Sequence, residues 1–411
     1  MSTHDTRVVV SGIGVITSIG TGIEEFTAGL RTGRSGVSPL TAFDTTGFDY
    51  ANACEVRDFK PGAWIRRMRP AHLSRAGQFA VAAARMAVED ATLGEDYLAG
   101  RRGHISIGTT AGGTREIDTL TEAGLAAEAG PRAWDPTVVR SIPAVSLSAA
   151  IATELGLSDV AVATLATACS AGNYAIGSGL DAIRLGEADY ALCGGAESVC
   201  RTTFTIFYRL GTIAPDCCRP FDSGRQGILT GEGAAVLLLE RLESALDRGA
   251  RIYAEVLGYG LNCDASHPVA PDQDSLARCM RLALDDAGVD PADVGLISAH
   301  GTGTKANDVT ECRAINDVFA GRPPRTVSLK SMIGHAMGAA SSISAAACAL
   351  AITNGFIPPT INHRETDPDC AIDCVPNHSV PADLRVVQSN GWAFGGNNAV
   401  ALFGRYEEHG E

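Results

Sequence analysis

The sequence predicts an α/β fold built from two related halves, and three observations support this prediction. Short apolar, strand-like runs alternate with helical stretches, as at residues 8–10, 105–107 and 235–239. Such alternation is typical of layers in which helices cover largely buried sheets. No long linker or low-complexity segment interrupts the alternation. One arrangement of elements also occurs twice along the chain.

The repeated arrangement is a helix with an acidic end, then a strand, then a turn rich in Gly and Thr. Its first copy lies within residues 79–110 and its second within residues 275–304. Related halves of this kind place their functional groups at strand ends that face each other. We therefore expect two halves, residues 1–255 and residues 256–411, with a site between them.

Charge and composition exclude several classes of function. The formal net charge is −14 and the isoelectric point is near 5.1, which argues against nucleic-acid binding and against a basic membrane surface. No apolar run of roughly 18 residues is evident, so we expect no membrane span. The twelve cysteines are scattered without paired C-x-x-C motifs or zinc-type histidines. With no secretory signal before the first strand, free thiols in a cytoplasmic protein are expected.

Gly12 and Gly14 follow the first apolar run in a pattern close to a dinucleotide-binding loop. The third glycine of that motif is missing, because Thr17 occupies its position. We therefore expect a tight turn after the strand and no dinucleotide site.

Cys169 stands in the turn 167–173, between a strand predicted at residues 160–165 and a helix predicted at residues 174–185. The strand is short, apolar and β-branched, which favours a buried position. A cysteine before a helix meets the positive end of the helix dipole and free backbone N–H groups, and both favour the reactive thiolate. The local sequence alone leaves a second interpretation open, a buried structural cysteine.

Three further segments combine reactive side chains with glycine-rich turns, and they support the reactive interpretation. They are residues 298–308 with His300, residues 328–340 with Lys330 and His335, and residues 390–399. A single histidine after a strand is usually structural. Two histidines at Gly-rich turns, with a lysine five residues before one of them, indicate a catalytic site.

These segments and Cys169, together with residues 219–222, 231–234 and 358–362, resemble the β-ketoacyl-acyl-carrier-protein synthases. These are the decarboxylating condensing enzymes of the thiolase-like superfamily, and the match runs over nearly the whole chain. The resemblance implies a thiolase-like five-layer αβαβα sandwich, usually dimeric. It implies no metal and no bound cofactor, because phosphopantetheine arrives on the acyl carrier protein.

The resemblance also implies a role for each matching residue of the catalytic set. Cys169 matches the nucleophile that accepts the acyl chain. His300 and His335 match the pair that activates the malonyl thioester, where two hydrogen-bond donors would stabilise the enolate charge formed on loss of carbon dioxide. Lys330 matches the lysine that sets the electrostatics around the second histidine.

Further matches concern the approach to the nucleophile. Phe394 matches a gating aromatic residue between the acyl pocket and the extender side. Thr302 and Thr304 match threonines that hydrogen-bond the phosphopantetheine arm. The backbone N–H groups of Cys169 and Phe394 would form the oxyanion hole that acyl transfer requires.

The chain departs from the family pattern at several positions. Ser344 replaces a glutamate that pairs with the lysine in fatty-acid elongation enzymes, so Lys330 needs another partner, for which Asp308 and Glu311 are the candidates. Ala111 occupies a position that often holds a branched residue at the pocket floor. A smaller side chain there admits a longer or stiffer acyl chain, or reflects packing alone.

An acidic carrier protein requires a basic docking patch despite the negative net charge. The densest basic cluster is Arg66, Arg67, Arg69 and Arg75, and family members carry basic residues in this region. We therefore expect carrier-protein docking at this cluster, and the alternative is a solvated surface patch.

The variant motifs favour a type II polyketide ketosynthase over a housekeeping fatty-acid elongation enzyme. Such ketosynthases pair with a second copy or with a homologous chain-length-factor subunit that lacks the cysteine. A non-catalytic chain-length-factor-like role for this chain, a thiolase and a Cys-His hydrolase are the alternatives. The complete catalytic set, Cys169, His300, Lys330 and His335, argues against the non-catalytic role.

Overall fold

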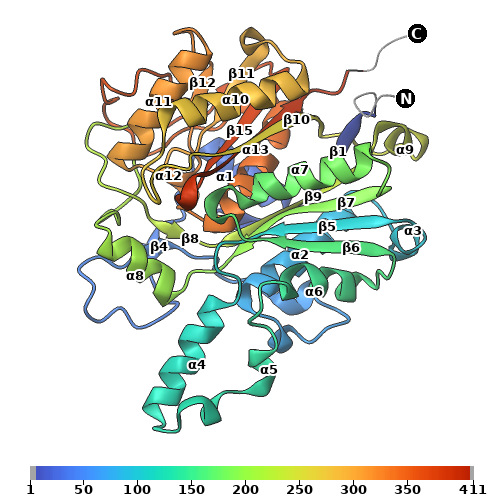
Figure 1. Ribbon diagram of the computed structural model, residues 1–411, viewed down its shortest axis with the longest axis vertical. Helices are drawn as coiled ribbons and strands as arrows, with labels where there is room; N and C mark the ends of the chain where they lie inside the picture. The colour runs from blue at the N-terminus through green and yellow to red at the C-terminus, as the bar shows by residue number, and fades with distance from the viewer. Residues whose placement is uncertain (1–5, 408–411) are drawn as a thin grey trace.

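Ten strands of one continuous eleven-stranded sheet form two groups of five in the computed structural model, which describes residues 6–407 (Figure 1). The order in the N-terminal half is β1 (Val8–Thr17), β9 (Gly233–Arg241), β7 (Tyr190–Glu197), β5 (Gly103–Gly108) and β6 (Val160–Leu165). The order in the C-terminal half is β10 (Ala254–Cys263), β16 (Asn397–Gly404), β15 (Val386–Trp392), β11 (Val294–Ser298) and β12 (Arg325–Val327). The remaining strand, β2 (Gly20–Thr21), pairs with β1.

The two groups of strands repeat the same directions as well as the same order. In each group the first two strand pairs are antiparallel and the last two are parallel. The groups join where β1 pairs with β10, with Val9 opposite Glu255 and Val10 opposite Ala254. The fold of two related halves, predicted from the repeated helix, strand and turn, is confirmed.

Helices complete the five layers. Helices α7 (Ala171–Arg184) and α13 (Ala340–Asn354) touch each other and strands of both groups, so they form the central layer. On the outer faces, α2 (Arg75–Asp90) and α6 (Ser146–Leu155) cover the N-terminal strands, and α10 (Gln273–Ala287) with α11 (Lys305–Val318) covers the C-terminal side. Figure 1 shows α10 and α11 on the opposite side of the strands from α2 and α6. The αβαβα sandwich is therefore confirmed.

The central helix α13 corrects one sequence-based expectation. The stretch Met337–Asn354 is long and apolar enough to cross a membrane by length and composition. However, 89% of this stretch is buried inside the protein. An apolar helix covered by two sheets is hydrophobic all round for the same physical reason that a membrane span is. We interpret this helix as a core element.

Gly12 and Gly14 do not form the expected turn, because both lie within strand β1. A Cβ atom at Gly12 would lie 2.1 Å from the carbonyl oxygen of Ala87, and one at Gly14 would lie 1.8 Å from that of Ala83. These glycines therefore allow β1 to pack closely against the backbone of α2.

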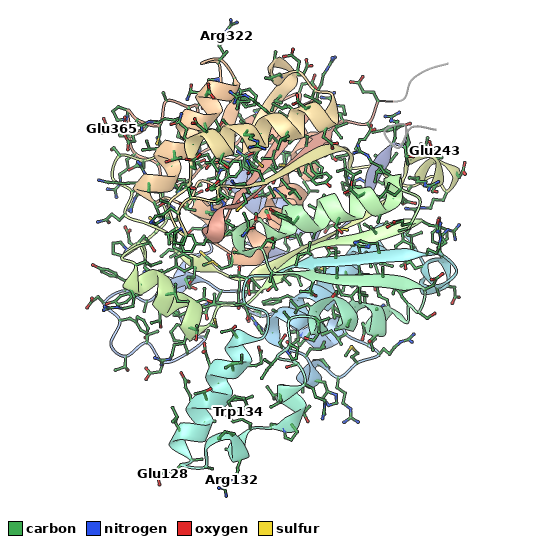
Figure 2. The ribbon with its side chains drawn as sticks, in the orientation of Figure 1. Glu128, Arg132, Trp134, Glu243, Arg322 and Glu365 are labelled. Atoms are coloured by element: carbon green, nitrogen blue, oxygen red, sulfur yellow. The ribbon has the colours of Figure 1, made fainter. Side chains whose placement is uncertain are left out.

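Strand β6 has the predicted bounds but is an edge strand and is not buried. It is the last strand of its group, and Val162 is 41% exposed. A periodicity argument recognises the strand but cannot tell an edge from the interior. Nearby, α4 (Thr114–Ala126) and α5 (Pro136–Val139) belong to a lobe that projects from the layers and carries Trp134 (Figures 1 and 2).

The remaining elements are short or peripheral. The helices are α1 (Ile23–Thr32), α3 (Glu95–Ala99), α8 (Arg201–Arg209), α9 (Leu242–Asp247) and α12 (Lys330–Ile333). The strands are β3 (Ser38–Pro39), β4 (Asn52–Cys54), β8 (Thr230–Gly231), β13 (Phe356–Ile357) and β14 (Val380–Pro381).

Candidate active site

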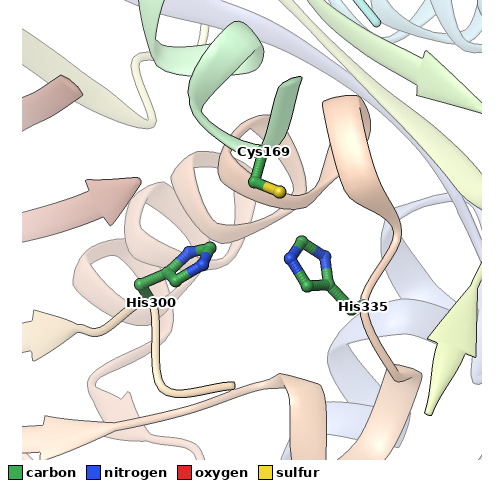
Figure 3. A group of neighbouring side chains, drawn as sticks. All are labelled: Cys169, His300 and His335. Atoms are coloured by element: carbon green, nitrogen blue, oxygen red, sulfur yellow. The ribbon is translucent and has the colours of Figure 1, made fainter. Parts of the chain in front are cut away.

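Cys169 lies in the short turn Ala168–Ser170 that follows β6 and leads directly into α7. Ala168 has a φ of 51°, a left-handed conformation that a residue with a side chain rarely adopts. Such strain is found where surrounding structure fixes a functional residue. The side chains of Cys169, His300 and His335 face one another in the site (Figure 3), and their potential ligand atoms all lie within 4.8 Å of one another.

His300 follows strand β11, and two buried charged groups hold its backbone. Its N–H donates to Glu311 Oε1 at 2.9 Å, while the N–H of Gly301 donates to Glu311 Oε2 at 2.8 Å. Lys330 Nζ donates to the carbonyl oxygen of His300 at 2.5 Å. The histidine is therefore fixed through its main chain, and its ring is left to act in the cavity.

His335 has a defined hydrogen-bonding state, because its Nδ1 accepts from the N–H of Met337 at 3.1 Å. In the neutral ring the proton consequently lies on Nε2. Burial, with a further contribution from Lys330, holds the pKa of both His300 and His335 well below the ordinary histidine value. Both rings are neutral at physiological pH, and His335 can donate a hydrogen bond from Nε2.

The same geometry bears on metal binding. Cysteine and histidine side chains are common zinc ligands, and this buried set of three has a suitable composition. A metal ion would need a lone pair on the free nitrogen of His335, where the neutral ring carries its proton. The set is thus better suited to donating hydrogen bonds than to holding a metal.

The thiol of Cys169 does not rest as the thiolate that its position at a helix start suggests. Burial raises its pKa to about 11, although Lys330 and the N–H groups of Cys169 and Phe394 act in the opposite direction. Only 5% of the residue is exposed, so the loss of hydration outweighs these favourable charges. The groups at the helix start favour the thiolate as predicted, but burial outweighs them in the unloaded site.

Alkylation of Cys169 by iodoacetamide should therefore accelerate steeply with pH. Below the pKa of the thiol the thiolate fraction rises about 10-fold per pH unit, so the rate should climb from pH 7 to pH 9 without levelling off. Mass spectrometry of the peptide containing Cys169 gives this rate, and the exposed Cys263 serves as an internal reference in the same digest. A plateau below pH 8 would show a preformed thiolate.

Lys330 finds its compensating charge mainly in Glu311. Burial lowers the pKa of Lys330, and Glu311 is the strongest of the groups that oppose this shift. Asp308 is engaged elsewhere, since it accepts from the N–H of Phe221 at 2.9 Å and lies 3.5 Å from Arg225 Nε. Within residues 6–407 no carboxylate oxygen within 4.0 Å of Lys330 Nζ is found, and the buried Ser344 provides no charge.

The cavity in front of Cys169 has a volume of about 210 Å³. Thr302 and Thr304 line it, and their hydroxyl oxygens are 2.9 Å apart. Phe394 also lines it, and the N–H groups of Phe394 and Cys169 both interact with the sulfur of Cys169. The arrangement can hold a thioester and stabilise negative charge on its oxygen.

The predicted docking arginines differ in accessibility. Arg66, Arg67 and Arg69 are exposed, and Arg66 pairs with Glu89 at 2.8 Å. Arg75 is half-buried: its Nη2 lies 2.9 Å from Glu232, and its guanidinium lies 4.5 Å from the ring of Phe79. Arg75 is thus held by contacts inside the protein, and a docking role for all four arginines stays a prediction.

Two residues at the site were not identified in the sequence. Glu197 accepts from the N–H of Thr110 at 2.6 Å and from that of Gly338 at 3.2 Å, so it joins the turn containing Ala111 to the turn after His335. Burial raises the pKa of this carboxyl to about 7. Phe207 of α8 lines the cavity beside Phe394. Glu197 follows Gly194 and Gly195 at the end of β7, a signal that could have identified it, whereas no local signal distinguishes Phe207 from a core residue.

The fold and the site together define a class of protein. A buried nucleophilic thiol at a strand-to-helix turn, with backbone donors and two neutral imidazoles, is suited to acyl transfer through a covalent thioester. This set lies between the two halves of a thiolase-like sandwich, as condensing enzymes require.

Comparison with known proteins identifies the family. Residues 5–245 match the beta-ketoacyl synthase N-terminal domain and residues 253–364 the C-terminal domain, so the chain belongs to the β-ketoacyl synthase family. It is 36% identical to 3-oxoacyl-[acyl-carrier-protein] synthase 2 of Synechocystis, with 98% of each chain covered. It is 38% identical to nodulation protein E of a Rhizobium species, covering 97% of this chain and 99% of the relative. These relatives support a transferase that carries out condensation.

Solved structures give the same result. The ishigamide ketosynthase/chain length factor superposes with a TM-score of 0.96 at 61% identity, over 98% of this chain and 100% of the other. A type II polyketide ketosynthase, solved with its acyl carrier protein and bound to the hexaketide, superposes with a TM-score of 0.89 at 32% identity over the same shares. The thiolase-like fold is therefore confirmed.

Proposed function

We propose that the protein accepts an acyl chain from an acyl carrier protein on Cys169 and condenses it with a malonyl carrier protein in type II polyketide biosynthesis. The observation that carries this proposal is the grouping of the Cys169 thiol with two neutral histidines inside a buried cavity. The complete catalytic set also argues against the alternative of a non-catalytic chain-length-factor-like subunit.

In the loading step the sulfur of Cys169 attacks the thioester carbon of the acyl carrier. The N–H groups of Cys169 and Phe394 would stabilise the oxyanion of the tetrahedral intermediate. The bond from the acyl carbon to the pantetheine sulfur breaks, and the proton from Cys169 leaves with the departing pantetheine thiol. Thr302 and Thr304, on the cavity wall, would hydrogen-bond the pantetheine arm.

In the condensation step the carbon–carbon bond to the malonyl carboxylate breaks and carbon dioxide leaves. The electron pair forms an enolate whose charge lies on the thioester oxygen. His335 would donate from Nε2 to this oxygen, and His300 would act beside it. The enolate carbon then attacks the acyl–Cys169 carbonyl, and the cysteine sulfur leaves as a thiolate that takes up a proton from water. The product on the carrier is longer by two carbons. No step calls on a metal or a bound cofactor.

The assignment to a polyketide pathway rests on the degree of similarity. The chain shares 61% identity with the ishigamide ketosynthase/chain length factor structure, against 36% with the Synechocystis 3-oxoacyl synthase. The small Ala111, in the turn bound by Glu197, agrees with an unusual acyl chain. Housekeeping fatty-acid elongation is the alternative.

For a partner subunit we propose a homologous chain, either a chain-length factor or a second copy. Among the described residues, β6 pairs with a neighbouring strand on one side only, and its apolar Val162 is exposed. A strand of a partner subunit can therefore pair with its free edge. The net charge of −14 and the twelve free cysteines agree with a cytoplasmic protein that binds no nucleic acid.

Charge reversal at the exposed arginines tests carrier-protein docking. The double variant Arg66→Glu with Arg67→Glu should raise the KM for acyl carrier protein roughly 10-fold, since two attractive charges become repulsive. The kcat at saturating carrier should stay within about 2-fold. The same changes should leave loading from a small acyl-pantetheine thioester unaffected. An unchanged KM for the carrier would show that docking occurs elsewhere.

The decisive experiment for the function is mass spectrometry of the product. The protein is mixed with acyl- and malonyl-carrier proteins, alone and with a co-expressed cysteine-less homologue. A 3-ketoacyl carrier product is expected. Formation of free acid alone, through an acyl–Cys169 intermediate, would support a hydrolase and overturn the proposal.

A further inference from the structure

We propose that Phe207 is a positioning residue that holds the gate residue Phe394 closed over Cys169 by packing its ring against that of Phe394. The inference rests on the proposed condensation at Cys169. It adds a second aromatic residue, from the opposite half of the molecule, to the gate.

The contact between the two rings is direct. Their centroids are 5.4 Å apart with an interplanar angle of 33°, and both residues line the cavity that contains Cys169. Phe207 is only 8% exposed, and its centroid lies 6.5 Å from that of His335. In the described part of the chain, Phe207 provides the aromatic ring that packs on Phe394.

Two glycines follow Phe394 in a short turn, whereas Phe207 lies in a helix. Gly395 and Gly396 follow with φ values of 81° and 74°, a region that glycine enters without strain. This turn joins β15 to β16 of the C-terminal half, with Gly395 exposed and its N–H donating to the carbonyl oxygen of Pro268 at 2.8 Å. Phe207 comes from the middle of α8 in the N-terminal half. The ring contact therefore crosses between the halves and adds to the contacts that hold the Phe394 turn.

Holding the ring also holds the oxyanion donor, because both belong to Phe394. Its N–H interacts with the sulfur of Cys169 in the closed arrangement. Rotation of the backbone at the two glycines would open the cavity to an acyl chain and withdraw this donor at once. A strong contact with Phe207 thus favours the closed arrangement, in which the oxyanion donor is in place. A weak contact favours the open arrangement, which admits the acyl chain.

Ordinary core packing is the competing interpretation, and a neighbour on the same helix separates the two. Phe204 is fully buried, and its ring meets those of Phe43 and Phe48 at centroid distances of 5.7 and 5.2 Å. It lies one helical turn before Phe207 and forms no ring pair with Phe394. Phe204→Leu is therefore a matched control for loss of an aromatic ring from α8.

The experiment compares Phe207→Ala, Phe207→Leu and Phe204→Leu in the full chain. The rate of Cys169 alkylation by iodoacetamide reports access to the sulfur, and single-turnover assays report acyl loading and condensation. Loss of one aromatic contact should raise alkylation in Phe207→Ala about 2- to 10-fold. Condensation per loaded enzyme should fall by a similar factor, so the two rates move in opposite directions. Phe207→Leu should show a smaller change of the same sign.

The control should leave the ratio of alkylation to condensation at the wild-type value. If Phe207→Ala fails to fold by circular dichroism, Phe207→Leu decides the question. Folded Phe207 variants with wild-type alkylation and an unchanged ratio would overturn the proposal. If the wild-type protein forms no ketoacyl product, the proposed function fails, and the alkylation rates still report whether Phe207 controls access to Cys169.

Discussion

Replacing Cys169 by alanine should abolish acyl loading. Cys169 is the one cysteine among the described residues that line the cavity, and loss of a covalent nucleophile costs at least about 1,000-fold in rate. Intact-mass spectrometry after incubation with acyl carrier protein should show no acyl adduct on the Cys169→Ala variant. The wild-type protein should gain the mass of one acyl group.

A neighbouring thiol provides the control for this experiment. Cys218 is buried close to the cavity, where its sulfur donates to the carbonyl oxygen of Thr302 at 3.2 Å. Burial raises the pKa of Cys218 well above the ordinary thiol value. Cys218→Ala should keep the adduct, and a persistent adduct in Cys169→Ala would show that another residue is the nucleophile.

The sequence predicts the fold well because the determining signals are local and occur in order. The apolar run 160–165 gives β6 its observed bounds, the run 105–107 lies in the middle of β5, and the repeated turn pattern identifies the two halves. The edge position of β6 depends on what lies beside it in space. No periodicity along the chain contains that information.

The candidate site likewise contains some residues that local motifs predict and others that only the packing of the chain reveals. Cys169, His300, Lys330 and His335 stand in distinctive glycine-rich segments, and the structure brings them together. Phe207 is a phenylalanine in an ordinary amphipathic helix, and its meeting with Phe394 depends on the packing of two halves. The resting state of the Cys169 thiol also depends on burial by distant segments, so the helix-dipole argument alone does not predict the direction of the net pKa shift.

Replacing His300 by alanine should separate the two half-reactions. Loading needs the thiol and the backbone donors, which the substitution leaves in place. Decarboxylation needs donors for the enolate oxygen, and removal of one such donor costs about 100- to 1,000-fold. The His300→Ala variant should thus form the acyl adduct while release of carbon dioxide from malonyl carrier protein falls by this factor. His104→Ala, which removes a histidine bonded to Ser178 away from the cavity, is the control.

The pH dependence of condensation distinguishes a neutral donor from an imidazolium. Because burial holds the pKa of His300 and His335 well below the ordinary value, both rings stay neutral from pH 7 to pH 8. Condensation by preloaded enzyme should therefore be nearly constant over this range. A charged histidine would instead lose its proton as the pH rises through its pKa, and the rate would fall. Such a fall, or normal condensation by His300→Ala, would contradict the role proposed for the neutral pair.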